Sequence, residues 1–272
     1  MKKINYLLIL IFFLFISCTS SRPKEKKDSE QDKFIELVSQ RIDSINSCIS
    51  ANPIQTEKNK AKKSYYTRRF FNIISNYADS IQIVKNWKGI VKDFKYEKGV
   101  NCSFIRLSIE MQYEGSNLRI HYPNNRIVLK SIYTIDNKLK DKDAVFNSMS
   151  QINTNSSVYI MGFFNRSMNG YVAVGDNIRE LNFSVLNIST TPISSYPISD
   201  NMKEAIDRKF KEMKILGRGM LNDKSEKKIE KEMAYLKIDS VRGTLNNDEI
   251  TLIDKIEELY VLNLAREYVD KK

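Results

Sequence analysis

The side chains that could do chemistry in this 272-residue chain are few, and their types exclude most active sites. His121 is the only histidine, and it stands in the segment LRIHYP. A Ser-His-Asp or Cys-His arrangement would depend on it, and the sequence has no Gly-x-Ser-x-Gly turn to hold a nucleophile. One histidine and separated cysteines cannot supply the local ligand set of a zinc site. We therefore expect no catalytic site, no metal and no cofactor.

Carboxylates are the remaining groups that could carry out a hydrolysis. Glycosidases use two facing carboxyl groups, and Glu110 and Glu114 lie in one region that alternates like a strand. Two glutamates beside a hairpin turn are more typical of solvent-facing residues. The same holds for Asp136, Asp141 and Asp143, which lack the pattern of a calcium loop and indicate a solvated turn. A carboxylate-dependent hydrolase is therefore the least favoured function.

Cysteine is the other reactive side chain, and one of the three cysteines has a distinctive setting. Cys18 ends an apolar run of about a dozen residues that follows Lys2 and Lys3. A membrane-spanning helix needs about 20 apolar residues, whereas a basic start, a short apolar core and a small residue are typical of a secretory signal. Ser17 is small, and polar residues follow Cys18 at once. We expect residues 1–17 to be a signal peptide that is cleaved between Ser17 and Cys18.

The stretch Phe15-Ile16-Ser17-Cys18 resembles the lipobox of bacterial prolipoproteins. The resemblance implies that a diacylglycerol joins the Cys18 thiol and that acyl chains such as palmitate hold the protein on a membrane of the cell envelope. Each buried CH₂ group contributes about 0.8 kcal/mol, so two or three chains give a stable anchor. The next residue, Thr19, is not the aspartate that retains some lipoproteins at the inner membrane. This favours an extracytoplasmic position at the outer membrane, if the cell has one.

Two further expectations concern the tether after the signal peptide and the remaining cysteines. Residues 18–31 contain no large apolar side chain, so we expect a disordered tether that holds the folded part off the membrane. Once Cys18 is lipidated, Cys48 and Cys102 are the remaining thiols. In an exported protein they either form one disulfide or lie as small buried apolar side chains, and the sequence leaves both open.

The formal net charge is +11, and the loss of two lysines with the signal would leave +9. A basic balance can indicate an anionic partner, such as phospholipid head groups, an anionic cell-wall polymer or nucleic acid. The charges are scattered along the sequence, however, which favours a solvated surface. Aromatic residues alternate with lysines around Trp87 and Phe94, as in single-strand-binding barrels, but most of them should point into a core. An exported protein does not normally meet nucleic acid, so we expect no nucleic-acid partner.

Hydrophobic periodicity divides the rest of the chain into three segments. Residues 32–80 have apolar side chains at helical spacing, interrupted at Asn52-Pro53. Residues 81–191 alternate apolar and polar side chains in seven or eight short segments, including VFNSM and GYVAVGD, separated by turn residues. This pattern predicts an antiparallel β-barrel or sandwich. Residues 192–272 return to helical spacing.

The C-terminal helical segment carries recognisable start and stop signals. Ser199 is placed to cap a helix over 201–215, and Gly217-Arg218-Gly219 is expected to end it. A highly charged stretch over 223–236 has a thin apolar seam that predicts a second helix. Asn246-x-x-Glu249 has the spacing of a capping box, so we expect the last helix to begin there and to end near residue 269.

Within 81–191, three short stretches occur in a recognisable order. They are Asn86-Trp87-Lys88-Gly89-Ile90-Val91, Ser131-Ile132-Tyr133 and Val158-Tyr159-Ile160-Met161-Gly162-Phe163-Phe164. This order resembles the OB-like β-barrels of uncharacterised bacterial envelope lipoproteins and covers roughly 105 residues. The resemblance implies that the Trp-x-Gly strand is the first long strand and that the Gly-Phe strand helps to close the barrel. It carries no catalytic residue.

We therefore expect an α+β protein, with a small antiparallel OB-like barrel between N-terminal and C-terminal helices. The predicted function is that of a membrane-anchored envelope lipoprotein, acting as a non-enzymatic binding or assembly component with an envelope protein as its partner. The alternative is a module that binds a glycan, a peptide or an anionic polymer on a barrel face. Fold alone does not decide between the two.

Overall fold

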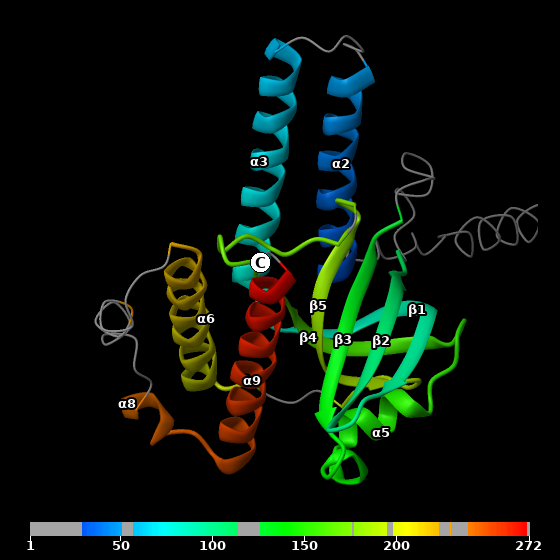
Figure 1. Cartoon of the computed structure of the whole chain (residues 1–272), viewed down its shortest axis with the longest axis vertical. Helices are drawn as coiled ribbons and strands as arrows, with labels where there is room; N and C mark the ends of the chain where they lie inside the picture. Colours follow the sequence, from blue (N-terminus) through cyan, green and yellow to red (C-terminus); the bar gives the residue numbers. More distant parts are fainter. Residues whose placement is uncertain are drawn as a thin grey trace, which may run out of the picture.

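The computed structural model describes residues 29–50, 57–113, 126–175, 177–194, 198–222, 229 and 239–270. Figure 1 shows three parts: a β-barrel, a helical hairpin that projects from one end of it, and further helices along its side. In the described part of the chain, no helix is both long and apolar enough to cross a membrane.

The barrel contains the strands β1 (Val84–Lys98), β2 (Cys102–Met111), β3 (Val128–Asp136), β4 (Ser157–Phe164) and β5 (Glu180–Ser189). It closes in the order β1-β2-β3-β5-β4. Four of the neighbouring pairs are antiparallel, and the β3–β5 pair is parallel. A closed ring with an odd number of strands cannot alternate direction all the way round, so one parallel pair is required. The expected α+β class with an OB-like barrel is confirmed.

The longest strand, β1, holds the barrel together by pairing with two partners. Its first half pairs with β4 and its second half with β2, and the register shifts in both pairings. Gly89 lies where the two pairings overlap, opposite Met111 on one side and Val158 on the other. A Cβ atom at this position would come within 2.4 Å of the Ile109 side chain. The Trp-x-Gly stretch therefore forms the long strand that the resemblance implied.

Two segments expected to be strands are not strands. Residues 144–150 form the helix α5 (Ala144–Ser150) behind the short 3₁₀ helix η1 (Lys140–Lys142). Asp143 starts α5 by accepting the Phe146 amide at 2.8 Å, and Phe146 and Met149 on one face are buried at the end of the barrel. Residues 170–175 form only isolated bridges. Alternation of apolar and polar residues predicted strands in both places. A short helix or an extended loop can bury the same apolar side chains, so the pattern does not distinguish them from a strand.

The N-terminal helices α2 (Glu30–Ser50) and α3 (Glu57–Ile81) form the projecting hairpin. Its base is anchored by Phe34 of α2, whose ring centroid lies 5.2 Å from that of Trp87 and 4.9 Å from that of Phe164. Offset aromatic pairs at such distances add to the free energy of ordinary apolar burial. The hairpin and the barrel therefore share one apolar core.

The C-terminal helices are α6 (Asp200–Leu221), the short α8 (Asp239–Arg242) and α9 (Asn247–Asp270), with α6 and α9 side by side against the barrel. Ser199 caps α6 as expected, since its hydroxyl accepts the Met202 amide at 3.1 Å. Asn246 and Glu249 exchange the two hydrogen bonds of a capping box at the start of α9. Of the helix expected over 223–236, only residue 229 is described.

The prediction that Gly217-Arg218-Gly219 ends a helix is wrong, because α6 continues to Leu221. These glycines serve close packing instead. A Cβ atom at Gly217 would lie 3.2 Å from the Met168 Cα, and one at Gly219 would lie 2.5 Å from the Ile229 side chain. Tertiary contacts thus outweigh the low helix propensity of glycine.

Candidate functional site

A groove with a volume of about 860 Å³ lies over the outward face of β1, β2 and β3. We call it the barrel groove. Ile105, Leu107 and Ile109 of β2 point into the core, so Arg106 and Ser108 between them point outward into the groove. The walls are the segment 165–175, which connects β4 toward β5, and the C-terminal end of α9. The groove is therefore formed jointly by the strands β1 to β3, the 165–175 segment and helix α9.

The 165–175 wall is held in place from two sides. On the side of α3, the Arg166 Nη2 atom lies 2.6 Å from the Asp79 Oδ1 atom, and the Val172 amide donates to the Ser75 hydroxyl at 2.9 Å. On the side of α9, the Met168 amide donates to the carboxylate of Glu267 at 2.8 Å. A wall fixed by three such contacts is preorganised for binding, because little ordering entropy remains to be lost.

Arg166 is the electrostatic centre of this wall. Its side chain is only 6% exposed, and burial lowers its pKa, an effect that the carboxylate of Asp79 opposes. Lys214 of α6 also approaches Asp79, with 3.5 Å between Nζ and Oδ2. Removing one partner of a buried pair leaves an uncompensated charge, so Asp79 is needed for the wall to stay folded. Arg166, Asp79 and Lys214 therefore stabilise the wall of the groove, and the charge of Arg166 is balanced by Asp79.

The floor of the groove carries cations that pair with glutamates. Lys95 and Arg106 both pair with Glu97, with N–O distances of 2.8 Å and 3.4 Å. The hydrogen bond from Lys95, assisted by the charge of Arg106, lowers the pKa of the Glu97 carboxyl. Lys130 lies 3.7 Å from a carboxylate oxygen of Glu180. The groove also contains neutral amide and hydroxyl side chains, namely Ser108, Ser131, Asn165, Ser167, Asn169, Asn182 and Asn263.

Helix α9 completes the groove beside the point where the hydrogen bonds between β3 and β5 end. The pairing of β3 with β5 ends at Lys130, and Arg266 then donates to the Ile132 carbonyl at 3.3 Å and to the Thr134 hydroxyl. Asn263 donates to the Ser184 hydroxyl of β5 at 2.9 Å. The helix therefore bridges the two strands where their own hydrogen bonds stop.

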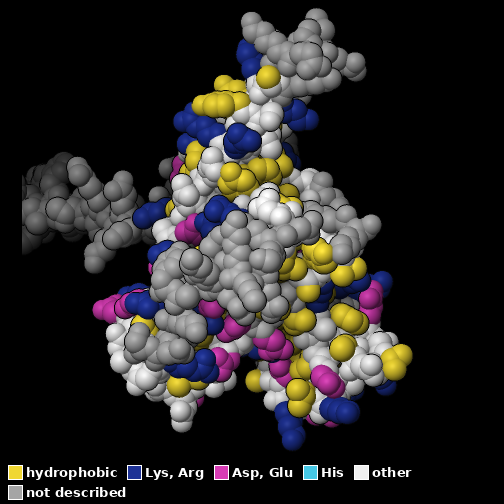
Figure 2. Space-filling model, turned by 60° about the vertical axis from the view of Figure 1, so that its left-hand side comes forward, with side chains coloured by type: hydrophobic (Ala, Val, Ile, Leu, Met, Phe, Trp, Pro, Cys, Tyr) yellow, Lys and Arg dark blue, Asp and Glu magenta, His cyan; other side chains and the backbone are white. Residues whose placement is uncertain are grey.

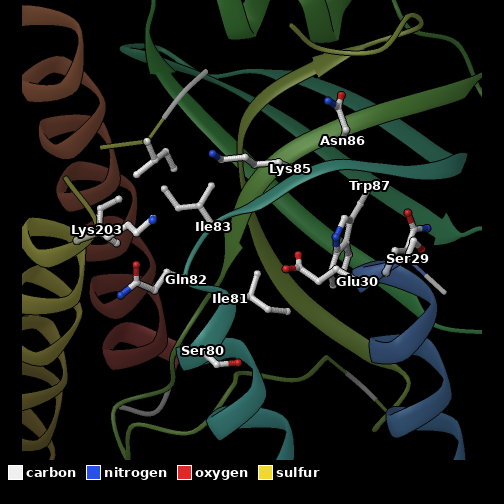
Figure 3. Close-up of a pocket in the computed structure, with 13 residues that line it drawn as sticks. Ser29, Glu30, Ser80, Ile81, Gln82, Ile83, Lys85, Asn86, Trp87 and Lys203 are labelled. Carbon is white, nitrogen blue, oxygen red and sulfur yellow. The ribbon is translucent and has the colours of Figure 1, made fainter. Parts of the chain in front are cut away.

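A second cavity of about 500 Å³ lies where the hairpin joins the barrel, beside α6. Figure 3 shows the Glu30 carboxylate next to the indole nitrogen of Trp87, and Lys85 and Lys203 extending from opposite sides. Burial raises the pKa of Glu30, whereas burial and the charge of Lys203 lower the pKa of Lys85. Lys203 in turn lies 2.8 Å from the carboxylate of Asp200. The barrel groove is the better candidate site, because its volume is larger than that of this cavity and its wall is held by hydrogen bonds from two sides.

Several residues singled out from the sequence lie outside the described residues. They are Ser17, Cys18, Glu114 and His121, so the signal cleavage and the lipid attachment stay predictions. The disulfide is also untested, because Cys102 is a half-buried free thiol at the start of β2 and the side chain of Cys48 is outside the described part.

The acidic residues considered for hydrolysis or for calcium binding have structural contacts. Glu110 pairs with Lys92 at 3.4 Å and with Arg126 at 3.6 Å. Asp143 caps α5 and accepts the Tyr133 hydroxyl at 2.7 Å, so this residue does more than line a solvated turn. In the ranges that the structure describes, no three His, Cys, Asp or Glu side chains are grouped as a metal site would require.

The aromatic residues divide between core and groove. Trp87, Phe163 and Phe164 are buried. Since Phe163 and Phe164 are consecutive in β4 and point to opposite faces, this strand is covered on both sides. Tyr171 lies in the groove next to Phe71 of α3, with 6.1 Å between the ring centroids. Sequence reasoning missed Phe71, the asparagines and the end of α9, because nothing local marks residues that meet from segments about a hundred positions apart.

No model of a protein family, no curated protein and no solved structure matches this chain.

Proposed function

We propose that this chain is a lipid-anchored envelope protein that binds an extended ligand in the barrel groove without converting it. The observation that carries the proposal is the groove itself. Its volume of about 860 Å³ lies within the roughly 300–1,000 Å³ typical of ligand sites, and its wall is preorganised. Its lining is rich in neutral amide and hydroxyl groups, several of which, such as Asn165 and Asn263, also hydrogen-bond within the protein.

The position of the groove on the barrel supports the same proposal by analogy. OB barrels bind oligonucleotides and oligosaccharides on the face of their second and third strands, beside the loop between the fourth and fifth strands. The barrel groove occupies that face, over β2 and β3 beside the 165–175 segment. Between a binding role and an assembly role, a preorganised groove favours binding.

The membrane anchor belongs to this proposal. Ten residues separate Cys18 from Ser29, where the described chain begins. Fully extended, a chain of this length reaches about 40 Å at most. With Cys18 lipidated, the folded part would stay near the membrane surface, where it would meet envelope polymers.

Isothermal titration of the full chain in detergent tests the proposal. The ligands are chitohexaose, a hyaluronan hexasaccharide and a mixed library of acetylated decapeptides. We expect at least one to bind with Kd below about 1 mM. Ile132→Trp should fill the groove and weaken that binding at least tenfold, because Ile132 lines it and is 38% exposed.

The matched control is Val100→Trp, which adds the same ring at a turn residue that is 96% exposed and outside the groove lining. It should bind like the wild type. Equal weakening by both variants, or no binding of any ligand by the wild type, would contradict the proposal.

A further inference from the structure

The barrel groove continues into a second depression. A cavity of about 420 Å³ lies between α3 and the 165–175 segment, and we call it the α3 cleft. Phe71, Asn169 and Tyr171 line both the cleft and the groove. The two spaces therefore form one path, which leads from the barrel face to the projecting hairpin.

The passage between them is aromatic. The rings of Phe71 and Tyr171 are 6.1 Å apart at an interplanar angle of 31°, and both side chains are half-buried. A ligand that runs along the path must pass these rings. Aromatic side chains offer a large apolar surface with a polar hydroxyl at the tyrosine end, which suits the apolar face and hydroxyl rim of a sugar ring.

Charge distinguishes the two ends of the path. Lys63 and Arg68, in the α3 cleft, are exposed and form no ion pair with another described residue. Residues 61–78 contain four basic and no acidic side chains, and Figure 2 shows dark blue Lys and Arg side chains over the projecting hairpin. On the groove floor, by contrast, Arg106 and Lys130 pair with glutamates. Lys63 and Arg68, at the α3 end, therefore carry positive charge that no described residue pairs with.

We infer that the barrel groove and the α3 cleft together bind one acidic polysaccharide chain, with Lys63 and Arg68 contacting its anionic groups. The inference rests on the proposed function and names the ligand class of that site. Nucleic acid carries a phosphate on every unit and would need free cations along the whole path. An acidic glycan carries charge on only some of its sugars, which matches free cations at one end and, along the remainder, neutral amides together with cations that pair with glutamates.

Two double variants of α3 test this inference. Lys63→Ala with Arg68→Ala removes the two cations that line the cleft. Lys62→Ala with Arg69→Ala removes two equally exposed cations of the same helix that do not line it. Both variants change the net charge by the same amount, so they separate a contact in the cleft from a general electrostatic effect.

The readout is the Kd of the full chain for a hyaluronan hexasaccharide and for uncharged chitohexaose, at low and at physiological salt. We expect wild type to prefer the acidic hexasaccharide. The cleft variant should lose about tenfold in affinity for it and much less in affinity for chitohexaose, while the control variant keeps the preference. The loss should shrink at higher salt, because ions screen exposed charges.

Three outcomes would overturn the inference. Equal losses in both variants would show that the charge effect is not located in the cleft. Equal wild-type affinity for the two glycans would show that the groove does not select acidic chains, and the proposed binding function would still stand. Tighter binding of a twelve-residue thymidine oligonucleotide than of the hyaluronan hexasaccharide would assign the path to nucleic acid.

Discussion

Single residues of this protein often serve two elements at once, and Glu249 is an example. One carboxylate oxygen accepts the Asn246 amide at 3.0 Å and so completes the capping box of α9. The other accepts the Ser199 hydroxyl at 2.6 Å, and Ser199 is itself the cap of α6. These hydrogen bonds, the Ser199 bond first, lower the pKa of Glu249. The starts of the two helices are therefore tied together by one carboxylate.

The stability that Glu249 contributes should depend on pH. Its pKa in the folded state is below the ordinary value of 4.5, so the contribution is present above about pH 4.5 and is lost as the pH falls through the folded-state pKa. Glu249→Gln should lower the midpoint of thermal unfolding at pH 7, and the difference from wild type should shrink at pH 3. Glu258→Gln, on the same helix, is the control. A difference independent of pH would contradict this explanation.

At the scale of elements, the barrel depends on a position where the backbones of the paired strands β4 and β5 lie unusually close together. Gly162 lies opposite Val185, next to a register shift. A Cβ atom there would lie 2.1 Å from the Ser184 carbonyl oxygen and 2.5 Å from the Phe183 ring. Because the carbonyl belongs to the backbone, the clash can be relieved only by moving a strand. Sequence resemblance placed Gly162 in a closing strand, and the spacing explains why a glycine is needed.

Gly162→Ala should therefore destabilise the protein by about 3 kcal/mol or prevent its folding. Gly243→Ala is the matched control, because a Cβ atom at Gly243 meets no atom within 4 Å. We expect this control to stay within about 0.5 kcal/mol of the wild type. Urea unfolding followed by circular dichroism would measure both. A Gly162→Ala protein as stable as the control would show that β4 and β5 are less closely packed than described.

At the scale of the whole molecule, helix α3 connects parts that are distant in sequence. Its C-terminal end supplies Ser75 and Asp79 to the wall of the barrel groove, and its N-terminal half supplies Lys63 and Arg68 to the α3 cleft. The hairpin is therefore part of the proposed binding surface.

The proposed anchor predicts that radiolabelled palmitate is incorporated into the wild-type protein in the native host and not into Cys18→Ala. The reason is that Cys18 is the thiol at the end of the lipobox-like stretch. Cys102→Ala, which removes a thiol of the barrel, should keep the label. Label on neither the wild type nor this control would contradict lipid attachment.

The sequence by itself determined the class of most elements. Helical spacing, alternation, the capping residue Ser199 and the Asn246–Glu249 pair are local patterns, and the helices and barrel strands follow them closely. It failed at residues 144–150 and at Gly217, where burial against other elements outweighs local preference.

Only the tertiary structure decided where a site could be. The barrel closes by pairing β1 with β4 and β3 with β5, and these contacts join residues far apart in sequence. That closure brings Phe71, Tyr171 and the end of α9 to one groove. The structure also shows that charges scattered along the sequence form ion pairs on the barrel, whereas Lys63 and Arg68 of α3 form none with a described residue. Spacing along a chain specifies an element, but a binding surface depends on distances in space that spacing does not contain.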